Sequence, residues 1–243
     1  MVKSGGRPGY NRPALTGTMH SPETLRCRPG GMMLESVVTA LNQPALTVWA
    51  YPMSWAEVLG FATGLLCVWL VGRRHILNFP VGIANCALLF LLFFEARLFA
   101  DAGLQLVFIL LGFQGWWLWS RGVREDGLAV SRLDGDHWIG VLGASVLLTG
   151  SLYLLLTWAK GSVPLADALI TSLSLSAQWL LNRRKLESWY FWIVVDLISI
   201  PLYAYKQLYL IAVLYGVFLG LCVMGLRAWR QEMASPAVAE GAA

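Results

Sequence analysis

A short pattern of aromatic and acidic residues near position 190 holds the side chains best suited to binding a ligand. Trp189, Trp192 and Asp196 follow a basic cluster at 183–185 and run into an apolar stretch. On a helix, positions i, i+3 and i+7 share one face, so two indoles and a carboxylate would line up over two turns. A charge at membrane depth costs roughly 2.5 to 3.5 kcal/mol and therefore needs a partner, a water-filled cavity or a ligand. The pattern predicts a site for a planar organic cation, held by stacking, cation–π attraction and charge pairing.

Other polar side chains inside apolar stretches are candidates for the same site, and each has a structural alternative. Asn85 could contact the ligand or bridge two helices through its amide, a common role in membranes. Gln178 and Asn182 lie at i and i+4, and they could bind a carboxamide or cap a neighbouring loop. The two indoles could instead anchor a helix at the membrane interface, and Asp196 could pair with Asn85 or with a buried tyrosine. Three further candidates are Gln105 and Tyr215, which could bind a ligand or each other, and Trp116.

The composition is that of a membrane protein. Of the 243 residues, 57% are hydrophobic and only 13% are charged, which is too apolar for an ordinary soluble domain. The apolar residues form long runs, which predicts transmembrane helices and not a barrel of short alternating strands. The net charge of +4 comes from basic residues in short clusters between these runs. Membrane topology explains such clusters without any nucleic-acid partner.

Seven apolar runs are long enough to cross a bilayer, so the sequence predicts an all-α integral membrane protein with seven transmembrane helices. The runs are 55–71, 76–94, 100–119, 138–158, 165–181, 189–205 and 208–229. The flanking segments are expected to be a disordered tail at 1–31, an interfacial segment at 32–54 with a short helix within 34–51, and a disordered tail at 231–243.

The basic residues of the loops predict the orientation of the helices, because such residues accumulate on the cytoplasmic side. One side carries ten of them, and the other carries only Arg97, Lys160 and Lys206. With seven spans, we therefore expect the amino terminus outside and the carboxyl terminus inside. The ten residues of the cytoplasmic side are Arg73, Arg74, Arg121, Arg124, Arg132, Arg183, Arg184, Lys185, Arg227 and Arg230.

An internal repeat appears when the sequence is shifted by 110 positions. Arg73–Arg74 then falls on Arg183–Arg184, Phe79 on Trp189, and Trp119 on Trp229. The repeat predicts a first three-helix unit at 55–119, a loop and linker helix at 120–160, and a second three-helix unit at 161–230. An odd linker helix leaves both units in the same orientation. Parallel repeats of this kind occur in transporters, whose substrate site lies between the repeats near the bilayer midplane.

Two motifs resemble the hallmarks of a known family. The segment 112–119, Gly-Phe-Gln-Gly-Trp-Trp-Leu-Trp, is similar to the ending of the third span in the PnuC family of bacterial vitamin transporters. Asn182, followed by Trp189, Trp192 and Asp196, resembles the second hallmark of that family. With Asn85 and Gln105, the resemblance covers about residues 53–230. This chain has Asp196 where many members carry Asn, which strengthens the case for a cationic ligand.

The resemblance implies a 3+1+3 (SWEET-like) transporter that takes up nicotinamide riboside by facilitated diffusion. A cytoplasmic kinase would then phosphorylate the substrate and trap it inside the cell, as a first step toward NAD. Thiamine, or riboflavin, is the alternative substrate, and both thiamine and nicotinamide riboside are cations. A proton-coupled symporter is a further alternative, with Asp196 as its single clear candidate. The resemblance also suggests a homotrimer as the assembly.

No enzyme mechanism can be assembled from these residues. His20, His75 and His137 all fall outside the predicted spans, so a serine nucleophile in a span would lack a base. Asp167 lies near the opposite end of its span from Asp196, which argues against a paired-carboxylate protease. Acidic and histidine side chains do not cluster as metal ligands would. We therefore expect neither a catalytic residue nor a metal nor another cofactor.

Overall fold

The computed structural model describes residues 39–41, 43–48, 51–95, 99–125, 129–160 and 163–234. Contacts divide the chain into Met1–Val37 and Val38–Ala243, and all described residues belong to the second unit. The tail expected at 1–31 lies outside the described residues, as do the last nine positions of the tail expected at 231–243.

Seven long helices make up the described part of the chain, and five of them are long and apolar enough to cross a membrane. The protein is thus a helical multi-pass membrane protein. Of the other two, α3 holds a shorter apolar stretch, Asn78–Phe94, and α6 is more polar. The helices are α2 (Trp55–Gly72), α3 (Asn78–Glu95), α4 (Phe99–Glu125), α5 (Gly135–Trp158), α6 (Pro164–Asn182), α7 (Ser188–Tyr205) and α8 (Tyr209–Met233).

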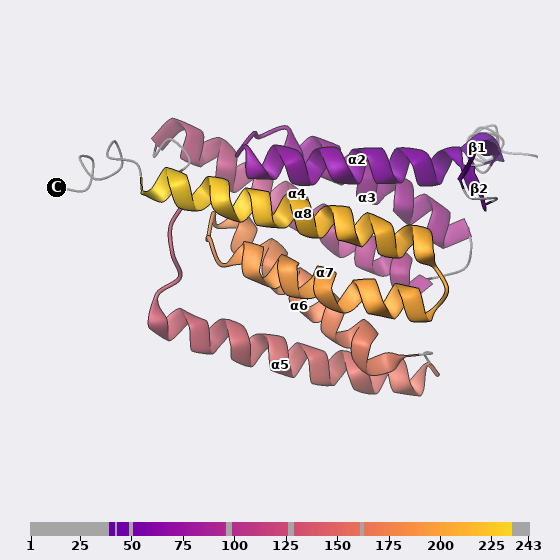
Figure 1. Ribbon diagram of the computed structural model, residues 1–243. Helices are drawn as coiled ribbons and strands as arrows, with labels where there is room; N and C mark the ends of the chain where they lie inside the picture. The colour runs from indigo at the N-terminus through magenta and orange to yellow at the C-terminus, as the bar shows by residue number, and fades with distance from the viewer. Residues whose placement is uncertain are drawn as a thin grey trace, which may run out of the picture. The chain divides into compact units, whose positions relative to one another are not determined.

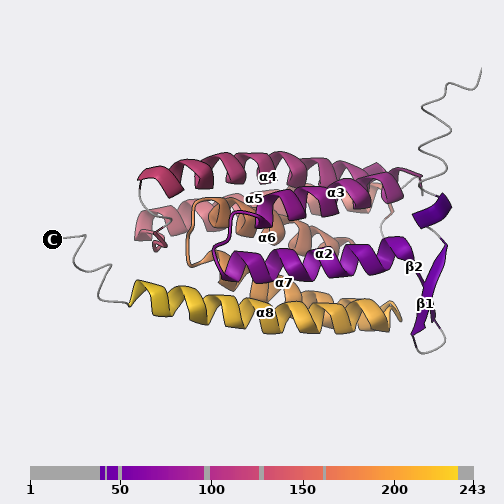
Figure 2. The ribbon, with the colours of Figure 1, turned by 90° about the horizontal axis from the view of Figure 1, so that it is seen from above.

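Six of these helices form a closed ring. Going round, α2 packs on α3, α3 on α4, α4 on α6, α6 on α7, α7 on α8, and α8 on α2 again. Figure 2 shows α2 beside α8, where the ring closes. The remaining helix, α5, packs mainly on α6, and Figure 1 shows it at the edge of the bundle. The ring therefore consists of two three-helix groups, α2–α4 and α6–α8, which meet at α4–α6 and at α2–α8.

The position of α6 explains how a helix of the bundle can carry this many polar residues. It packs on three neighbours, α4, α5 and α7, so little of its surface is left for lipid. Its serines, Ser172 and Ser174, are buried, and so is Asn182 at its end. Polar side chains are tolerated in such a helix because neighbouring helices satisfy their hydrogen bonds.

The bounds of the helices follow the 110-residue offset. Helices α3 and α7 begin at Asn78 and Ser188, and α4 and α8 begin at Phe99 and Tyr209. The loops after α2 and α6 also match, because Arg74 and Arg184 adopt left-handed backbone conformations with φ of 54° and 57°. Two sequences that share both helix bounds and this turn conformation fold into equivalent three-helix groups.

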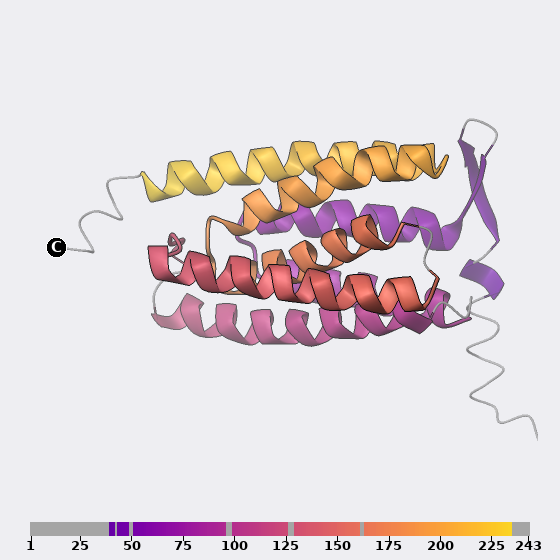
Figure 3. The same ribbon diagram turned by 90° about the horizontal axis from the view of Figure 1, so that it is seen from below.

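Residues just before α2 differ in part from the expectation of a short interfacial helix, because residues 39–41 are helical but residues 44–48 and 51–54 are not. They form two antiparallel strands, β1 (Pro44–Val48) and β2 (Tyr51–Ser54). Figures 2 and 3 show this hairpin at one end of the bundle, whereas the carboxyl-terminal end of α8 lies at the other. Two prolines explain the difference, because Pro44 and Pro52 are poor residues for a helix interior but are tolerated in edge strands. Helix α2 then begins at a capping box, in which Ser54 and Glu57 satisfy each other's backbone N–H groups.

Two helices run further than the predicted spans. Helix α4 continues past residue 119 to Glu125, and α8 continues past 229 to Met233, so residues 231–233 belong to a helix and not to a tail. The added turns carry charged residues, among them Arg121 and Arg230. Long basic side chains can keep such turns helical while their charged ends reach water. An estimate from apolar runs alone misses these extensions.

Candidate functional site

The acidic residue of the candidate site, Asp196, lies in the middle of α7 and is buried, with 3% of its surface exposed. Its Oδ2 has no hydrogen-bond partner among the described residues. Two side chains of α8, Cys222 and Tyr215, lie close enough to interact with the carboxylate electrostatically. A carboxylate at this depth without a basic partner is suited to receive a cation.

Tyr215 is half-buried and stands against a second tyrosine. Its ring stacks on Tyr203 of α7, with 5.2 Å between ring centroids and an interplanar angle of 17°. Phe218 packs edge-on against the other side at 6.0 Å. Asp196, Tyr215 and Cys222 thus form one group at the α7–α8 contact, where a carboxylate, a phenol and a thiol lie together.

Trp189 is fully enclosed, with 1% of its surface exposed, and it contacts other aromatic residues. Its ring meets Trp229 of α8 edge-on at 5.5 Å. The matching pair in the other half of the ring is Phe79 and Trp119, which meet edge-on at 5.1 Å. Trp119 and Trp229 join the two pairs at 6.4 Å. These four rings, here called the aromatic cluster, fill the space between the two three-helix groups.

Two glycines make room for the aromatic cluster. An added Cβ on Gly115 would overlap the ring of Phe79, and one on Gly225 would overlap the ring of Trp189. Both glycines lie four residues before a tryptophan of the cluster, so each helix presents the gap and the ring on the same face. The repeated Gly-x-x-x-Trp pattern is therefore explained by packing.

Trp192 lies one turn further along α7 and is half-buried. It packs against the buried apolar group that contains the aromatic cluster and against a second apolar group that includes Leu180 and Phe191. Part of its ring stays accessible, unlike that of Trp189. Of the two predicted stacking residues, only Trp192 is exposed enough to stack on a ligand. It lies between Trp189 and Asp196 in the sequence.

Amide groups connect the two halves of the ring at the α4–α6 contact. Asn182, 1% exposed, donates from Nδ2 to the carbonyl of Leu111 at 2.8 Å and to Oε1 of Gln114 at 3.3 Å. Gln178 donates from Nε2 to Oδ1 of Asn182 at 2.9 Å. Gln178 and Asn182, the predicted i, i+4 pair, therefore lie on one face of α6. The amide nitrogen of Asn182 is used for hydrogen bonds to α4. Gln178 keeps its own Oε1 available.

Asn85 bridges two helices of the first half. Its Nδ2 donates to the carbonyl of Gly60 at 2.8 Å and to Oγ1 of Thr63 at 2.6 Å, both in α2. The predicted pairing of Asp196 with Asn85 is not among the contacts described. No hydrogen bond to Oδ1 of Asn85 is found among the described residues, so the bridge and a ligand contact are compatible.

The two remaining candidates lie apart from these groups. Gln105 is half-buried in α4, and no hydrogen bond is described for it. Trp116 is 38% exposed on the outer side of α4. A contact between Gln105 and Tyr215 is likewise not found among the described residues.

A polar seam between α5 and α6 escaped the sequence analysis. Thr149 and Ser172 share a hydrogen bond of 2.6 Å, and Ser145 and Ser176 share one of 2.8 Å. Each helix presents its two hydroxyls at i and i+4, and this spacing could have revealed the seam. A pocket of about 460 Å³ lies beside it, lined mainly by apolar side chains such as Val141, Leu175 and Trp179. None of the nine predicted site residues lines that pocket.

Five of the predicted residues thus lie at three helix contacts. Asp196 and Tyr215 lie at the α7–α8 contact, Gln178 and Asn182 at the α4–α6 contact, and Asn85 between α2 and α3. Trp192 stands on the same helix as Asp196, about 6 Å nearer the basic end at 1.5 Å per residue. Within the described part of the chain, no three His, Cys, Asp or Glu side chains are arranged to hold a metal ion.

Comparison with known proteins gives concordant matches. A family model described as nicotinamide mononucleotide transporter matches residues 54–231. The nicotinamide riboside transporter PnuC of Escherichia coli K12 is 26% identical over 206 residues, covering 74% of this chain and 86% of that protein. The riboflavin/roseoflavin transporter RibM of Streptomyces davaonensis is 28% identical over 209 residues, covering 83% and 98%. A crystal structure of the vitamin B3 transporter PnuC superposes with a TM-score of 0.60 at 25% identity, covering 84% of this chain and 89% of that one.

Proposed function

This chain belongs to the nicotinamide mononucleotide transporter family, and from that premise we propose that it takes up nicotinamide riboside across the bacterial inner membrane. It is a transporter of a vitamin-uptake family and not an enzyme. Seven spans in a 3+1+3 arrangement are part of the proposal. In it, α2–α4 and α6–α8 are the two repeats, and α5 is the linker that gives both the same orientation.

The observation that carries the proposal is the buried carboxylate of Asp196. It lies inside the helix ring and has no basic partner among the described residues. Nicotinamide riboside carries a permanent positive charge on a planar ring. The ring would stack on Trp192 and place its charge toward Asp196, one turn deeper in the membrane.

The polar groups around this point would bind the rest of the substrate. Gln178 has an amide oxygen available for the carboxamide, and Asn85 and Tyr215 have oxygens suited to ribose hydroxyls. Gln105 and Asn182 remain further candidates, and Trp116 is the weakest because its ring lies on the outer side of α4. Trp189 and the rest of the aromatic cluster lie between Asp196 and the basic end, where they would close the pathway toward the cytoplasm.

The basic residues support the proposed orientation. The loop after α2 carries Arg73 and Arg74, and the loop after α6 carries Arg183, Arg184 and Lys185. Figure 1 shows both loops at the end of the bundle where α8 ends. That end would face the cytoplasm, with the amino terminus outside and the carboxyl terminus inside.

Transport by facilitated diffusion with trapping by a cytoplasmic kinase is the proposed mechanism of net uptake. The described spans hold one deeply buried carboxylate, Asp196, and coupling to protons would ordinarily need further titratable groups. Trapping would then depend on phosphorylation after entry, since the product carries a negative charge that the site is not built to bind. A homotrimeric assembly is part of the same expectation.

Uptake into proteoliposomes tests the proposal directly. Purified protein in kinase-free vesicles should equilibrate labelled nicotinamide riboside across the membrane without accumulating it, and an excess of unlabelled substrate should block entry. A protonophore should leave the rate unchanged. If uptake collapses with the protonophore, the protein is a proton-coupled symporter. If labelled nicotinamide riboside does not enter at all, the proposed substrate is wrong.

The second candidate substrate is another vitamin, namely thiamine or riboflavin. Thiamine is favoured by the same feature, because it too is a planar cation that Asp196 would attract. Riboflavin is named for one relative of similar identity, RibM, but its isoalloxazine ring is uncharged at neutral pH. Competition by each unlabelled vitamin against labelled nicotinamide riboside in the same vesicles separates the three.

A further inference from the structure

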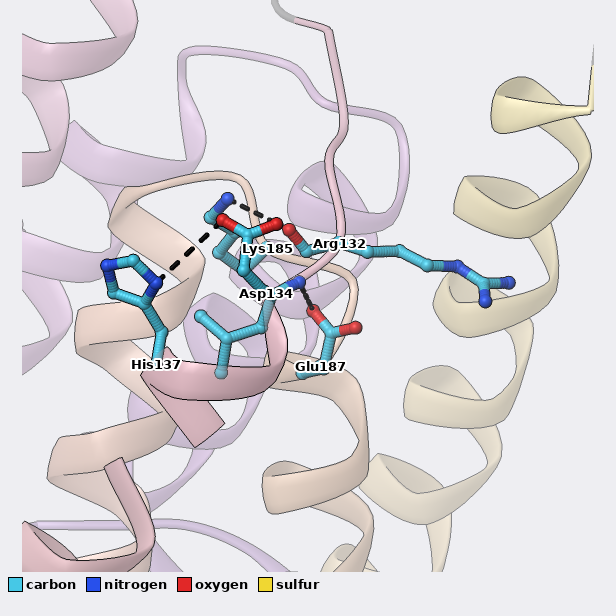
Figure 4. Close-up of polar contacts among 6 residues, drawn as sticks. Arg132, Asp134, His137, Lys185 and Glu187 are labelled. Atoms are coloured by element: carbon cyan, nitrogen blue, oxygen red, sulfur yellow. Dashed lines mark hydrogen bonds and ion pairs between the residues drawn. The ribbon is translucent and has the colours of Figure 1, made fainter. Parts of the chain in front are cut away.

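The segment just before α5, residues 129–134 and here called the strap, is bound to the loop between α6 and α7. The amide of Ser131 donates to the carbonyl of Arg184 at 3.2 Å, and the amide of Leu186 donates back to the carbonyl of Ser131 at 3.0 Å. The side chain of Lys185 adds a hydrogen bond to the carbonyl of Arg132 at 3.0 Å. Figure 4 shows the strap running beside this loop.

Glu187, at the end of the α6–α7 loop, adds a side-chain hydrogen bond to the strap. It is 5% exposed, and its Oε2 accepts a hydrogen bond of 2.9 Å from the amide of Leu133 (Figure 4). Glu187 is also the cap residue of α7, while Leu133 immediately precedes the cap residue of α5, Asp134. The carboxylate therefore stands at the amino-terminal ends of two helices, where a negative charge is stabilised by both helix dipoles.

The contact leads directly to the proposed substrate site. The carbonyl of Glu187 accepts hydrogen bonds from the amides of Tyr190 and Phe191, so it starts the first turn of α7. The side chain of Leu133 packs with Phe191 in the apolar group that also contacts Trp192. The position of Trp192, and of Asp196 one turn further along, depends on how this first turn is held.

The equivalent position in the first repeat has no such contact. Leu77 stands 110 residues before Glu187, also immediately before its helix, and its side chain is 52% exposed. A carboxylate at this place is thus a feature of the second repeat, where the strap arrives. Leu77 provides a matched control, because it has the same place in an equivalent loop.

We propose that Glu187 is a positioning residue for transport, which ties the strap to α7 and so holds Trp192 and Asp196 in the geometry that binds the substrate. The proposal rests on the function proposed above. Glu187 does not touch the substrate but acts through the first turn of α7. The sequence alone indicates no role for Glu187, because a charged residue in a basic loop is ordinarily solvated.

Substrate binding to purified variants tests the proposal. Calorimetry would measure the Kd for nicotinamide riboside and for thiamine with the wild type, Glu187→Ala, Glu187→Gln, Glu187→Asp and Leu77→Ala, and the unfolding temperature would be measured beside each. Glu187→Ala removes the acceptor and should raise the Kd about tenfold, since even small misplacement of binding groups is costly. Glu187→Gln keeps an acceptor oxygen at the same reach and should stay within about threefold of the wild type. Leu77→Ala should leave the Kd unchanged.

Glu187→Asp keeps the charge but is one methylene too short to reach Leu133, so it should weaken binding as Glu187→Ala does. If Glu187→Ala fails to fold, the Kd of Glu187→Asp tests the proposal in its place. Equal Kd values for all folded variants, with only the unfolding temperature lowered, would show a purely structural role and overturn the proposal. If the wild type binds neither vitamin, the proposed function itself is wrong, and the positioning role falls with it.

Discussion

The aromatic side chains of α7 differ in role: Trp189 is packed in the core, whereas Trp192 is exposed enough to bind a ligand. Trp189 and Trp192 stand three positions apart on one helix face, and their sequence context is similar. The structure separates them, because Gly225 opens a gap into which Trp189 fits completely, whereas Trp192 keeps an accessible surface. A stacking residue must leave one ring face available, so exposure and not residue type distinguishes the two.

Filling the gap under Trp189 should destabilise the protein. In Gly225→Ala the new methyl group would overlap the Trp189 ring, and overpacking of this kind costs about 1 to 3 kcal/mol. Gly220→Ala is the matched control on the same helix, because no atom lies within 4 Å of the Cβ position there. Thermal unfolding in detergent should therefore show a clear loss for Gly225→Ala and little change for Gly220→Ala. Equal unfolding temperatures would contradict the packing described.

The candidate site was predictable from sequence wherever a residue type was unusual for its surroundings. A carboxylate within an apolar run pointed to Asp196, and the structure places it in the interior. The same reasoning could not say which hydrogen bonds Asn85 and Asn182 make, because an amide in a membrane helix has the same sequence signature whether it binds a ligand or another helix. Here both amide nitrogens are engaged by neighbouring helices.

At the scale of elements, hydroxyl groups fasten the linker helix to the second repeat. Helix α5 packs mainly on α6, so its place in the fold depends largely on that contact. The seam of Ser145 and Thr149 with Ser172 and Ser176 supplies side-chain hydrogen bonds along it. Such bonds in membranes contribute about 0.6 kcal/mol on average and at most about 1.7 kcal/mol.

Removing one hydroxyl from the seam should loosen α5. Ser172→Ala deletes a buried group that bonds Thr149 and the carbonyl of Ser145, and we expect a loss of about 1 kcal/mol. Ser151→Ala is the control, because that exposed hydroxyl bonds only the carbonyl of Leu147 in its own helix. Limited proteolysis of the loop after α5, together with thermal unfolding, would measure the difference. The seam has no stabilising role if the two variants behave alike.

The contact between α4 and α6 contains side-chain hydrogen bonds between the two three-helix groups, and it too can be weakened. Asn182→Ala removes the amide that bonds Leu111 and Gln178, leaving buried polar groups without partners. We expect a loss of about 1 to 3 kcal/mol. Gln105→Ala, on α4 without a described hydrogen bond, should be nearly neutral. Thermal unfolding measures the stability of both variants. Equal losses of stability would show that the hydrogen bonds of Asn182 do not stabilise the α4–α6 contact.

Elements were predicted well where apolar runs are long and less well where prolines and polar residues intervene. All seven predicted spans coincide with helices, because a run of about 17 to 23 apolar residues has few other structures open to it in a bilayer. The hairpin before α2 was mistaken for an interfacial helix, since Pro44 and Pro52 were not given enough weight. The charged ends of α4 and α8 were missed, as hydropathy reports burial in lipid and not helix length.

Six of the described helices form a ring of two three-helix groups, and α5 lies outside it. The match between α3 and α7, and between α4 and α8, is visible in sequence only as scattered identities at a spacing of 110 residues. The closed order of contacts round the ring is not readable from the sequence, because hydropathy says nothing about which spans are neighbours. Under the proposed function, we expect a site between the groups to open to one side at a time as the groups move against each other.

Asp196 is proposed to bind the positive charge of the substrate, and two ligands of similar shape but different charge test this proposal. Nicotinamide riboside is a cation, whereas its reduced form, dihydronicotinamide riboside, has a closely similar shape without the charge. Calorimetry of the wild type and Asp196→Asn with both ligands would separate charge pairing from shape. Leu197→Ala, which changes a neighbouring side chain on the outer face of α7, is the control.

The account predicts that the wild type prefers the cation and that Asp196→Asn loses roughly tenfold to a hundredfold in affinity for it, corresponding to roughly 1 to 3 kcal/mol. Affinity for the neutral form should change little, and Leu197→Ala should bind both ligands as the wild type does. The claim is contradicted if Asp196→Asn binds the cation as tightly as the wild type does, or if it loses affinity for both forms equally.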